Sequence, residues 1–192
     1  MHVVRVLRVL LPVLVVAAVV GAGSSVLSAR PDLQKAKRDV DASWSALSGR
    51  LDNRYVLLAS VDDKLRPIPG PIHTIVGDVD SALARWHDVR THGGVAAQVA
   101  AANDLEGFAR RLVATAAASP RVSNDKAVLQ ALAQFLGDGS RAGAAGFNKT
   151  VTSYEHERRG PVRTVVASLL GEGAIPVLDT TDTKVSATTA SS

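Results

Sequence analysis

The chain contains no cysteine and only one methionine, and aromatic residues make up 4% of its 192 positions. The absence of cysteine excludes disulfides, thiolate metal ligands, a cysteine nucleophile and a lipid-bearing cysteine. Because aromatic side chains are scarce, Ala, Val and Leu must fill most of the core, which suits closely packed helices. Pro and Gly cluster at a few places instead of recurring about every 8–12 residues, as in all-β folds. The composition therefore predicts an all-α fold.

The chain also lacks any long run of like charges, although its net charge is +4. Basic residues alternate with acidic ones through the body, and no aromatic residues are interleaved with them to stack on bases. We therefore expect no nucleic-acid partner and a solvated helix surface. The alternative is contact with anionic lipid headgroups through four basic residues that follow the first apolar segment, Arg30, Lys35, Lys37 and Arg38.

One segment near the start is free of charge and long. As a helix, Val9–Leu27 (VLLPVLVVAAVVGAGSSVL) would extend about 28 Å, close to the thickness of the hydrocarbon core of a bilayer. We expect it to be a retained single-pass membrane anchor. The alternative is a signal peptide cleaved after Ala22, but the uncharged stretch continues to Leu27 and is longer than most such segments.

This anchor divides the chain into four parts. A basic segment (1–8) precedes the anchor (9–27), and a helical body (28–171) and a Ser/Thr-rich tail (172–192) follow it. We expect the tail to be disordered, because it has little apolar surface to bury.

Basic residues on the two flanks of the anchor nearly balance, so they do not decide on which side of the membrane the body lies. A short basic head followed at once by an apolar core is typical of an export signal, which favours a body outside the cytoplasm.

Apolar residues recur along the body at steps of three and four, the spacing of helices that bury one face. The first pattern runs from Leu33 to Leu58, with a helix start at Pro31–Asp32, and stops at the proline-rich stretch Arg66–Pro71. The second runs from Ile72 to Leu112. We expect it to form one long helix, or two collinear helices, with a soft point at Gly93–Gly94.

The third pattern runs from Val128 to Tyr154, after the N-cap candidates Ser123 and Asn124. Four glycines inside it predict either a close approach of a neighbouring backbone or a local break: Gly137, Gly139, Gly143 and Gly146. A short apolar helix follows Pro161. Together the patterns predict an extended antiparallel bundle of three long helices and a short C-terminal one, behind the transmembrane helix.

Two stretches of the body carry patterns of a known protein family. In KRDVDASWSALSGRLDNRY (residues 37–55), Ser-Trp is followed by Leu and then Arg-Tyr, and AGFNKTVTSYEHERRGPVRTVVASLLG (residues 145–171) has Phe-Asn, Val, Tyr and a Pro before an apolar helix. Both resemble the bacterial LemA family. The chain departs from that family at residues 56–61 and around Gly139–Gly143, as a diverged member would. The resemblance implies membrane attachment and a helical bundle, but no reaction.

Five residues in these stretches are candidates for a structural or functional role: Trp44, Arg54, Tyr55, Asn148 and Tyr154. The simplest interpretation of the three aromatic residues is that they are core residues whose polar tips find partners. A sharper hypothesis is that Arg54 and Asn148 form a polar network that joins the first and third helices.

No catalytic or metal-binding pattern accompanies these residues. Four histidines in the body have no HExxH spacing, namely His73, His87, His92 and His156, and no serine lies in a Gly-x-Ser-x-Gly elbow. We therefore expect no enzyme, no cofactor and no metal site.

The function expected from the sequence is that of a membrane-anchored scaffold or interaction protein of the bacterial cell envelope. Its partners would be the lipid bilayer, through Val9–Leu27, and either other proteins or a second copy of the chain. The alternative is a ligand-sensing or substrate-binding bundle, with a cavity lined by small residues of the third pattern, Gly139, Gly143 and Gly146.

Overall fold

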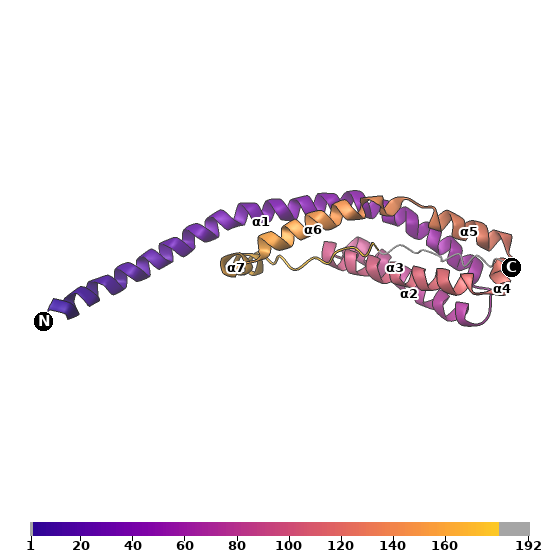
Figure 1. The fold of residues 1–192 in the computed structure, drawn as a ribbon, viewed down its shortest axis with the longest axis horizontal. Coiled ribbons are helices and arrows are strands. Elements are labelled where there is room, and N and C mark those ends of the chain that lie inside the picture. The colour runs from indigo at the N-terminus through magenta and orange to yellow at the C-terminus, as the bar shows by residue number, and fades with distance from the viewer. Residues whose placement is uncertain (1, 181–192) are drawn as a thin grey trace, which may run out of the picture.

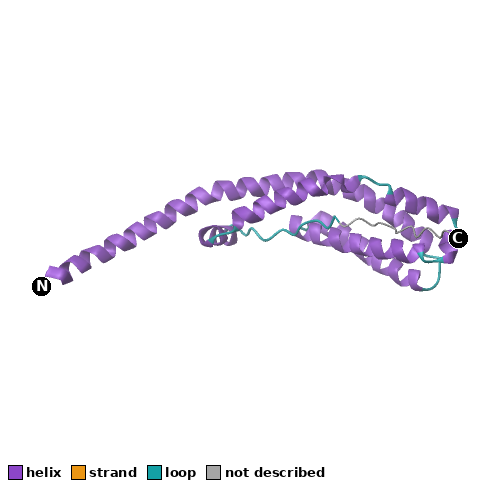
Figure 2. Ribbon diagram, viewed as in Figure 1, coloured by secondary structure: helices purple, strands orange, loops and turns teal. Residues whose placement is uncertain are grey.

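The computed structural model describes the backbone of residues 2–180 and the side chains of residues 30–161 and 163–180. Within residues 2–180 every regular element is a helix, and the molecule is long and narrow (Figures 1 and 2). The prediction of an all-helical bundle is confirmed for this part of the chain. The elements are α1 (His2–Leu65), α2 (Pro71–His92), α3 (Val95–Ala117), α4 (Pro120–Ser123), α5 (Lys126–Leu136), the 3-10 helix η1 (Ser140–Gly143), α6 (Ala144–Arg158) and α7 (Pro161–Leu169).

Helix α1 is the spine of the molecule, with 64 residues in one continuous helix. Its C-terminal half buries the predicted stripe from Leu33 to Leu58 and extends it through Val61 and Leu65. The prediction that the first bundle helix begins at Pro31–Asp32 was wrong, because α1 passes through both residues. A proline inside a helix removes one backbone hydrogen bond. Pro31 does so here without ending the helix, and its side chain is exposed.

The expected anchor Val9–Leu27 belongs to the part of α1 whose side chains lie outside the described residues. In the part of the chain that the structure describes, no helix is both long enough and apolar enough to cross a bilayer.

Helices α2 and α3 form an antiparallel hairpin, which corrects the expectation of one long helix or two collinear ones. Ion pairs across the hairpin join Arg85 to Asp104 and Arg111 to Asp78, so the two helices run side by side in opposite directions. The reversal takes only Gly93 and Gly94, both in extended conformations. Gly93 is required there because a β-carbon would lie 2.8 Å from the carbonyl oxygen of Val89.

The third predicted helix is broken into α5, η1 and α6. The N-cap of α5 is Asp125, one residue beyond the expected candidates Ser123 and Asn124. The Asp125 carboxylate accepts bonds from the backbone N–H groups of Ala127 and Val128. The glycine-rich middle of this pattern forms the break, and a local break is one of the two outcomes that the four glycines predict. Gly143 also approaches α1, since a β-carbon there would lie 3.3 Å from the Leu47 side chain.

The segment after α7 differs from the disordered tail that the sequence predicts. Residues 172–180 run back along the bundle, with Ile175 and Leu178 buried (Figure 1). These two apolar side chains and several polar contacts described below hold the segment in place. The rest of the tail, residues 181–192, lies outside the described residues.

Helix α1 packs against α5 and α6 as well as against the α2–α3 hairpin, so its buried face runs along the core. Where these elements meet, four aromatic rings are in contact. Trp86 packs edge-on against Trp44 and Tyr55, with ring centroids 6.4 Å and 5.0 Å away, and Phe147 lies 5.0 Å from Trp44. One aromatic residue from each of α2 and α6 thus meets two from α1.

We predict that Gly93→Ala destabilises the protein by about 1–3 kcal/mol, because the added methyl group must displace backbone atoms. Gly94→Ala is the matched control, since a β-carbon there meets nothing within 4 Å; at this N-cap position of α3 it should cost less than about 1 kcal/mol. Urea unfolding of the two variants measures the difference. Equal midpoints would show that the reversal does not depend on the close approach at Gly93.

Candidate functional site

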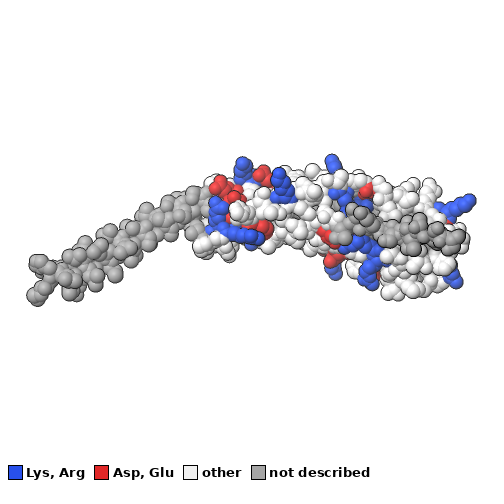
Figure 3. Space-filling model, viewed as in Figure 1, with Lys and Arg blue, Asp and Glu red and all other residues white. Residues whose placement is uncertain are grey.

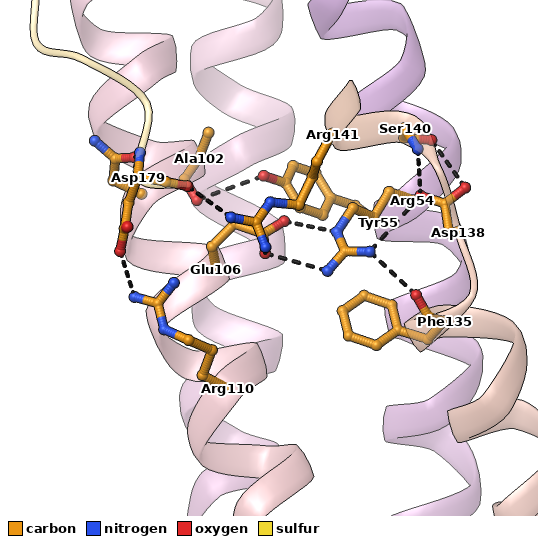
Figure 4. A network of polar contacts seen from close by, with 11 residues as sticks. Arg54, Tyr55, Ala102, Glu106, Arg110, Phe135, Asp138, Ser140, Arg141 and Asp179 are labelled. Atoms are coloured by element: carbon orange, nitrogen blue, oxygen red, sulfur yellow. Dashed lines mark hydrogen bonds and ion pairs between the residues drawn. The ribbon is translucent and has the colours of Figure 1, made fainter. Parts of the chain in front are cut away.

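The most densely bonded polar site lies in the middle of the bundle, around Arg54 of α1 (Figure 4). Arg54 donates to both carboxylate oxygens of Glu106 on α3, from Nε to Oε1 at 2.7 Å and from Nη2 to Oε2 at 3.2 Å. Both side chains are buried, and Glu106 is 0% exposed. This fork geometry is the strongest form of an arginine–carboxylate pair, and it fixes the spacing of α1 and α3.

The last turn of α5 and the loop after it complete the surroundings of Arg54. Nη1 of Arg54 donates to the backbone oxygen of Phe135 at 3.1 Å and lies 3.7 Å from a carboxylate oxygen of Asp138. The guanidinium carbon also lies 4.1 Å from the centre of the Phe135 ring, within range of a cation–π interaction. Arg54 therefore joins three parts of the chain that are distant in sequence.

A second arginine approaches Glu106 from the other side. Arg141 of η1 has its Nη1 3.7 Å from Glu106 Oε2 and donates from Nη2 to the backbone oxygen of Asp179 at 2.9 Å. The Asp179 carboxylate in turn pairs with Arg110 of α3 at 2.6 Å. The network thus continues from the buried ion pair to the C-terminal segment (Figure 4).

Tyr55 lies beside this ion pair, and its hydroxyl donates to the backbone oxygen of Ala102 at 3.4 Å. Burial, and secondarily the Glu106 carboxylate, raises the pKa of Tyr55 well above its ordinary value. The hydroxyl therefore stays neutral and keeps its proton for the hydrogen bond. The interpretation of Tyr55 as a core residue whose polar tip finds a partner fits these contacts.

The other candidate on α1, Trp44, belongs to a second polar cluster near the hairpin reversal. Its indole N–H donates to Gln98 Oε1 at 2.7 Å, and Gln98 also accepts from Arg90 at 3.1 Å. Arg90 and the Trp86 indole both donate to Asp52. This cluster ties α1 to both helices of the hairpin.

Asn148 and Tyr154 of α6 hold the C-terminal segment. The Asn148 amide makes two hydrogen bonds with the backbone of Leu178, each 2.8 Å long, in the manner of a strand pair. The Tyr154 hydroxyl donates to the Gly173 carbonyl at 3.0 Å, and burial first, then Glu172, raises its pKa to about 12. Arg54 does join the first predicted helix to the third, through the Phe135 backbone oxygen and Asp138, but the described bonds of the Asn148 amide go to Leu178 and not to Arg54.

Three residues of these clusters were not predicted from the sequence: Glu106, the partner of Arg54, Gln98, the partner of Trp44, and Asp179, which bonds to Arg110 and Arg141. Glu106 and Gln98 do carry a signal, since each falls on the apolar face of α3 between residues such as Val99, Ala102 and Leu105. A polar residue on a buried stripe needs a buried partner. Asp179 gives no such signal, because its segment has no helical period.

The arrangement at Glu106 is suited to holding elements together more than to proton transfer. A general base needs a lone pair within reach of a substrate. Glu106 is fully buried, and both its oxygens already accept bonds from Arg54. The described contacts therefore give this site a structural and orienting chemistry.

Two surface hollows lie away from this network. A groove of about 390 Å³ between α1 and α2 is lined by residues that include Tyr55, Val56, Leu83, Trp86, His87 and Arg90. A more apolar hollow of about 270 Å³ lies between α3, α4 and α5, with Leu129 and Leu136 exposed at it. Neither is lined by Gly139, Gly143 or Gly146, the residues expected to line a ligand cavity.

A separate carboxylate cluster closes the corner between α1 and α2. The buried Asp62 carboxylate accepts a bond from Arg66 at 3.1 Å, and Arg66 also donates to both oxygens of Asp80 on α2, at 2.8 and 3.0 Å. Burial, and secondarily the Asp80 carboxylate, raises the pKa of Asp62 to about 7. Asp62 is therefore protonated in the folded protein at pH values where it is ionised in the unfolded chain.

Comparison of the chain with known protein families, with curated proteins and with solved structures finds no match.

We predict that Arg54→Met lowers the free energy of unfolding by about 3–5 kcal/mol, because it leaves the Glu106 charge buried without its main partner. The double variant Arg54→Met/Glu106→Leu should recover part of this loss, since it removes both charges. A double-mutant cycle measured by denaturant unfolding gives the coupling. Arg85→Met at the exposed pair with Asp104 is the control and should cost less than about 1 kcal/mol. Additive effects of the two buried substitutions would contradict this account.

We predict that Asn148→Leu lowers the melting temperature by several degrees, because Leu178 loses both of its bonds to the amide, a loss of about 1–3 kcal/mol. Thr152→Ala is the control on the exposed face of the same helix, where the hydroxyl bonds only to its own backbone turn. An unchanged melting temperature for Asn148→Leu would show that the C-terminal segment adds nothing to stability.

The raised pKa of Asp62 predicts a pH dependence of stability. The folded protein holds this proton up to about pH 7, whereas the unfolded chain releases it near the ordinary aspartate pKa of about 4. Between these values the unfolded state binds fewer protons, so this group lowers the free energy of unfolding as pH rises. Asp62→Asn removes the effect and should become progressively more stable than the unmodified chain as pH rises from about 4 to about 7. Exposed Asp63→Asn is the control, and a pH-independent difference for Asp62→Asn would refute the assignment.

Proposed function

We propose that this chain is a non-enzymatic helical scaffold or interaction protein of the bacterial cell envelope, anchored in the membrane by Val9–Leu27. The observation that carries the proposal is the continuity of α1, which runs from His2 to Leu65. The predicted anchor and the core of the bundle therefore share one helix. A helix transmits position and orientation, so the body would stand at a fixed height and angle over the bilayer.

The resemblance to the LemA family supports the same architecture, with a transmembrane helix ahead of the bundle. The basic head before the apolar segment supports a body outside the cytoplasm. The polar contacts described above support a non-enzymatic role, because the buried Arg54 and Glu106 side chains and the half-buried Asn148 side chain are all engaged with the protein itself.

The apolar hollow between α3, α4 and α5 supports an interaction role. It lies at the end of the bundle farthest from the N-terminus, where a partner would meet it without steric interference from the bilayer (Figure 1). An apolar recess of this kind suits a hydrophobic anchor residue of a partner protein or of a second copy.

The test is site-specific photocrosslinking of the full chain in bacterial membranes. A photoreactive residue at Leu129 or Leu136 should give a discrete adduct with a protein partner or a second copy, and Leu136→Glu should abolish the Leu129 adduct. A photoreactive residue at Ser153, exposed on α6, is the control. The chain should also resist alkaline extraction from the membrane unless residues 9–27 are deleted. Release of the intact chain by alkali, or identical adducts at all three positions, would refute the proposal.

The second candidate function is ligand binding, favoured by the groove of about 390 Å³ beside Trp86. The Trp86 and Tyr55 rings, together with the cation of Arg90, would suit a small aromatic or anionic ligand. Trp86 fluorescence should then respond to that ligand, and His87→Ala should weaken the response without loss of the fold.

A further inference from the structure

Helix α7 exposes an apolar face that no described part of the body covers. Val165 is 56% exposed and Leu169 is 79% exposed. Since they are four residues apart, they lie on one side of the helix. Val166 and Ala167 are buried and hold the other side against the body. Thr164 and Ser168, both exposed, lie along one edge of this apolar face.

The position of α7 places this face at the end of the body nearest the predicted anchor. Helix α7 packs on α1 and α6, at the end of the bundle from which α1 projects toward the N-terminus (Figure 1). The first buried residue among the described side chains of α1 is Leu33, which is about 9 Å along the helix axis from Leu27 at the end of the anchor. The interfacial layer on each side of the hydrocarbon core is about 5–8 Å thick. The near end of the body thus borders that layer.

The orientation of α7 also fits a membrane surface. Figure 1 shows α7 strongly foreshortened, nearly along its own axis, whereas α1 and α6 run across the view. Helix α7 therefore lies crosswise to the length of the molecule. If α1 crosses the bilayer, a crosswise helix lies in the plane of the interface, as amphipathic surface helices do.

The charges around α7 are compatible with lipid headgroups. Acidic and basic side chains gather together at this end of the body (Figure 3). Several are paired with each other, such as Arg158 with Glu155 and Arg163 with Glu157. Arg159, at the turn into α7, is exposed, as are Arg30, Lys35 and Arg38 on α1. Arg30 is about 4.5 Å along the helix axis from Leu27, at the level of the lipid phosphates, and the cations farther along would be attracted to anionic lipids.

We propose that α7 is a second membrane contact, which inserts Val165 and Leu169 into the interface of the bilayer that the anchor crosses. This proposal rests on the proposed function, since it requires the anchor in Val9–Leu27. A helix resting on the surface would fix the rotation of the body about α1, which a single spanning helix leaves free. The body would then present the groove beside Trp86 and the apolar hollow of α3–α5 in defined directions.

The test uses single-cysteine variants of the full chain, which has no native cysteine. Each is labelled with an environment-sensitive fluorophore and reconstituted in vesicles of phosphatidylcholine and phosphatidylglycerol that contain lipids with a quencher at headgroup depth. The variants are Leu169→Cys in α7, Val56→Cys as the matched exposed apolar control far along α1, and Val15→Cys in the middle of the predicted anchor. Quenching at Leu169 should be several-fold stronger than at Val56, with a blue-shifted emission.

The Val15 label separates failure of this proposal from failure of the anchor. If a quencher at the bilayer centre reaches Val15 but the Leu169 label behaves like the Val56 label, the anchor stands and the α7 contact is refuted. If Val15 is not quenched, both proposals are refuted. A blue shift at Leu169 that persists in detergent without lipid quenching would assign the face to a second copy of the chain, and would also refute the lipid contact.

Discussion

The ion pair between Arg54 and Glu106 is the constraint on which the rest of the bundle depends. A buried charge is tolerated only where partners surround it, and here the partners come from four parts of the chain. Helix α1 supplies Arg54, α3 supplies Glu106, the end of α5 with the loop after it supplies a carbonyl and a carboxylate, and η1 supplies Arg141. The C-terminal segment joins through Asp179. A shift of any one element would leave a charge unpaired in the core, so the pair specifies the register of all of them.

This constraint gives α1 its role in the account. The buried arginine locks the α2–α3 hairpin and the α5–α6 arm onto the C-terminal half of one 64-residue helix. The N-terminal half of the same helix contains the expected anchor. In the proposed function, the body and the expected anchor are parts of one helix, and α7 borders the place where they would meet. In the proposed function, the bundle serves to hold two surface hollows at fixed positions above a membrane.

Local patterns in the sequence were enough to predict the helices but not how they turn. The stripe through Leu33, Trp44 and Leu58 is buried as predicted, and the helix after Pro161 forms. The period of a helix is the same on both sides of Gly93–Gly94, so it cannot show that the chain reverses there.

The polar site was predicted only in part. Arg54 stands out among apolar neighbours, but its pairing with Glu106 spans 52 residues, and local spacing carries no information at that range. Residues 172–180 were missed because an extended segment held by side-chain amides has no helical period.

The central claim is that α1 is one unbroken helix from the membrane into the body, in spite of Pro31. The direct measurement is the distance between spin labels at Ser24→Cys and Ala46→Cys in the full chain reconstituted in vesicles, determined by pulsed electron paramagnetic resonance. A continuous helix predicts a single narrow distribution centred at about 33 Å, from the rise of about 1.5 Å per residue. A broad distribution, or a mean many ångströms shorter, would show a hinge at Pro31 and would contradict the account.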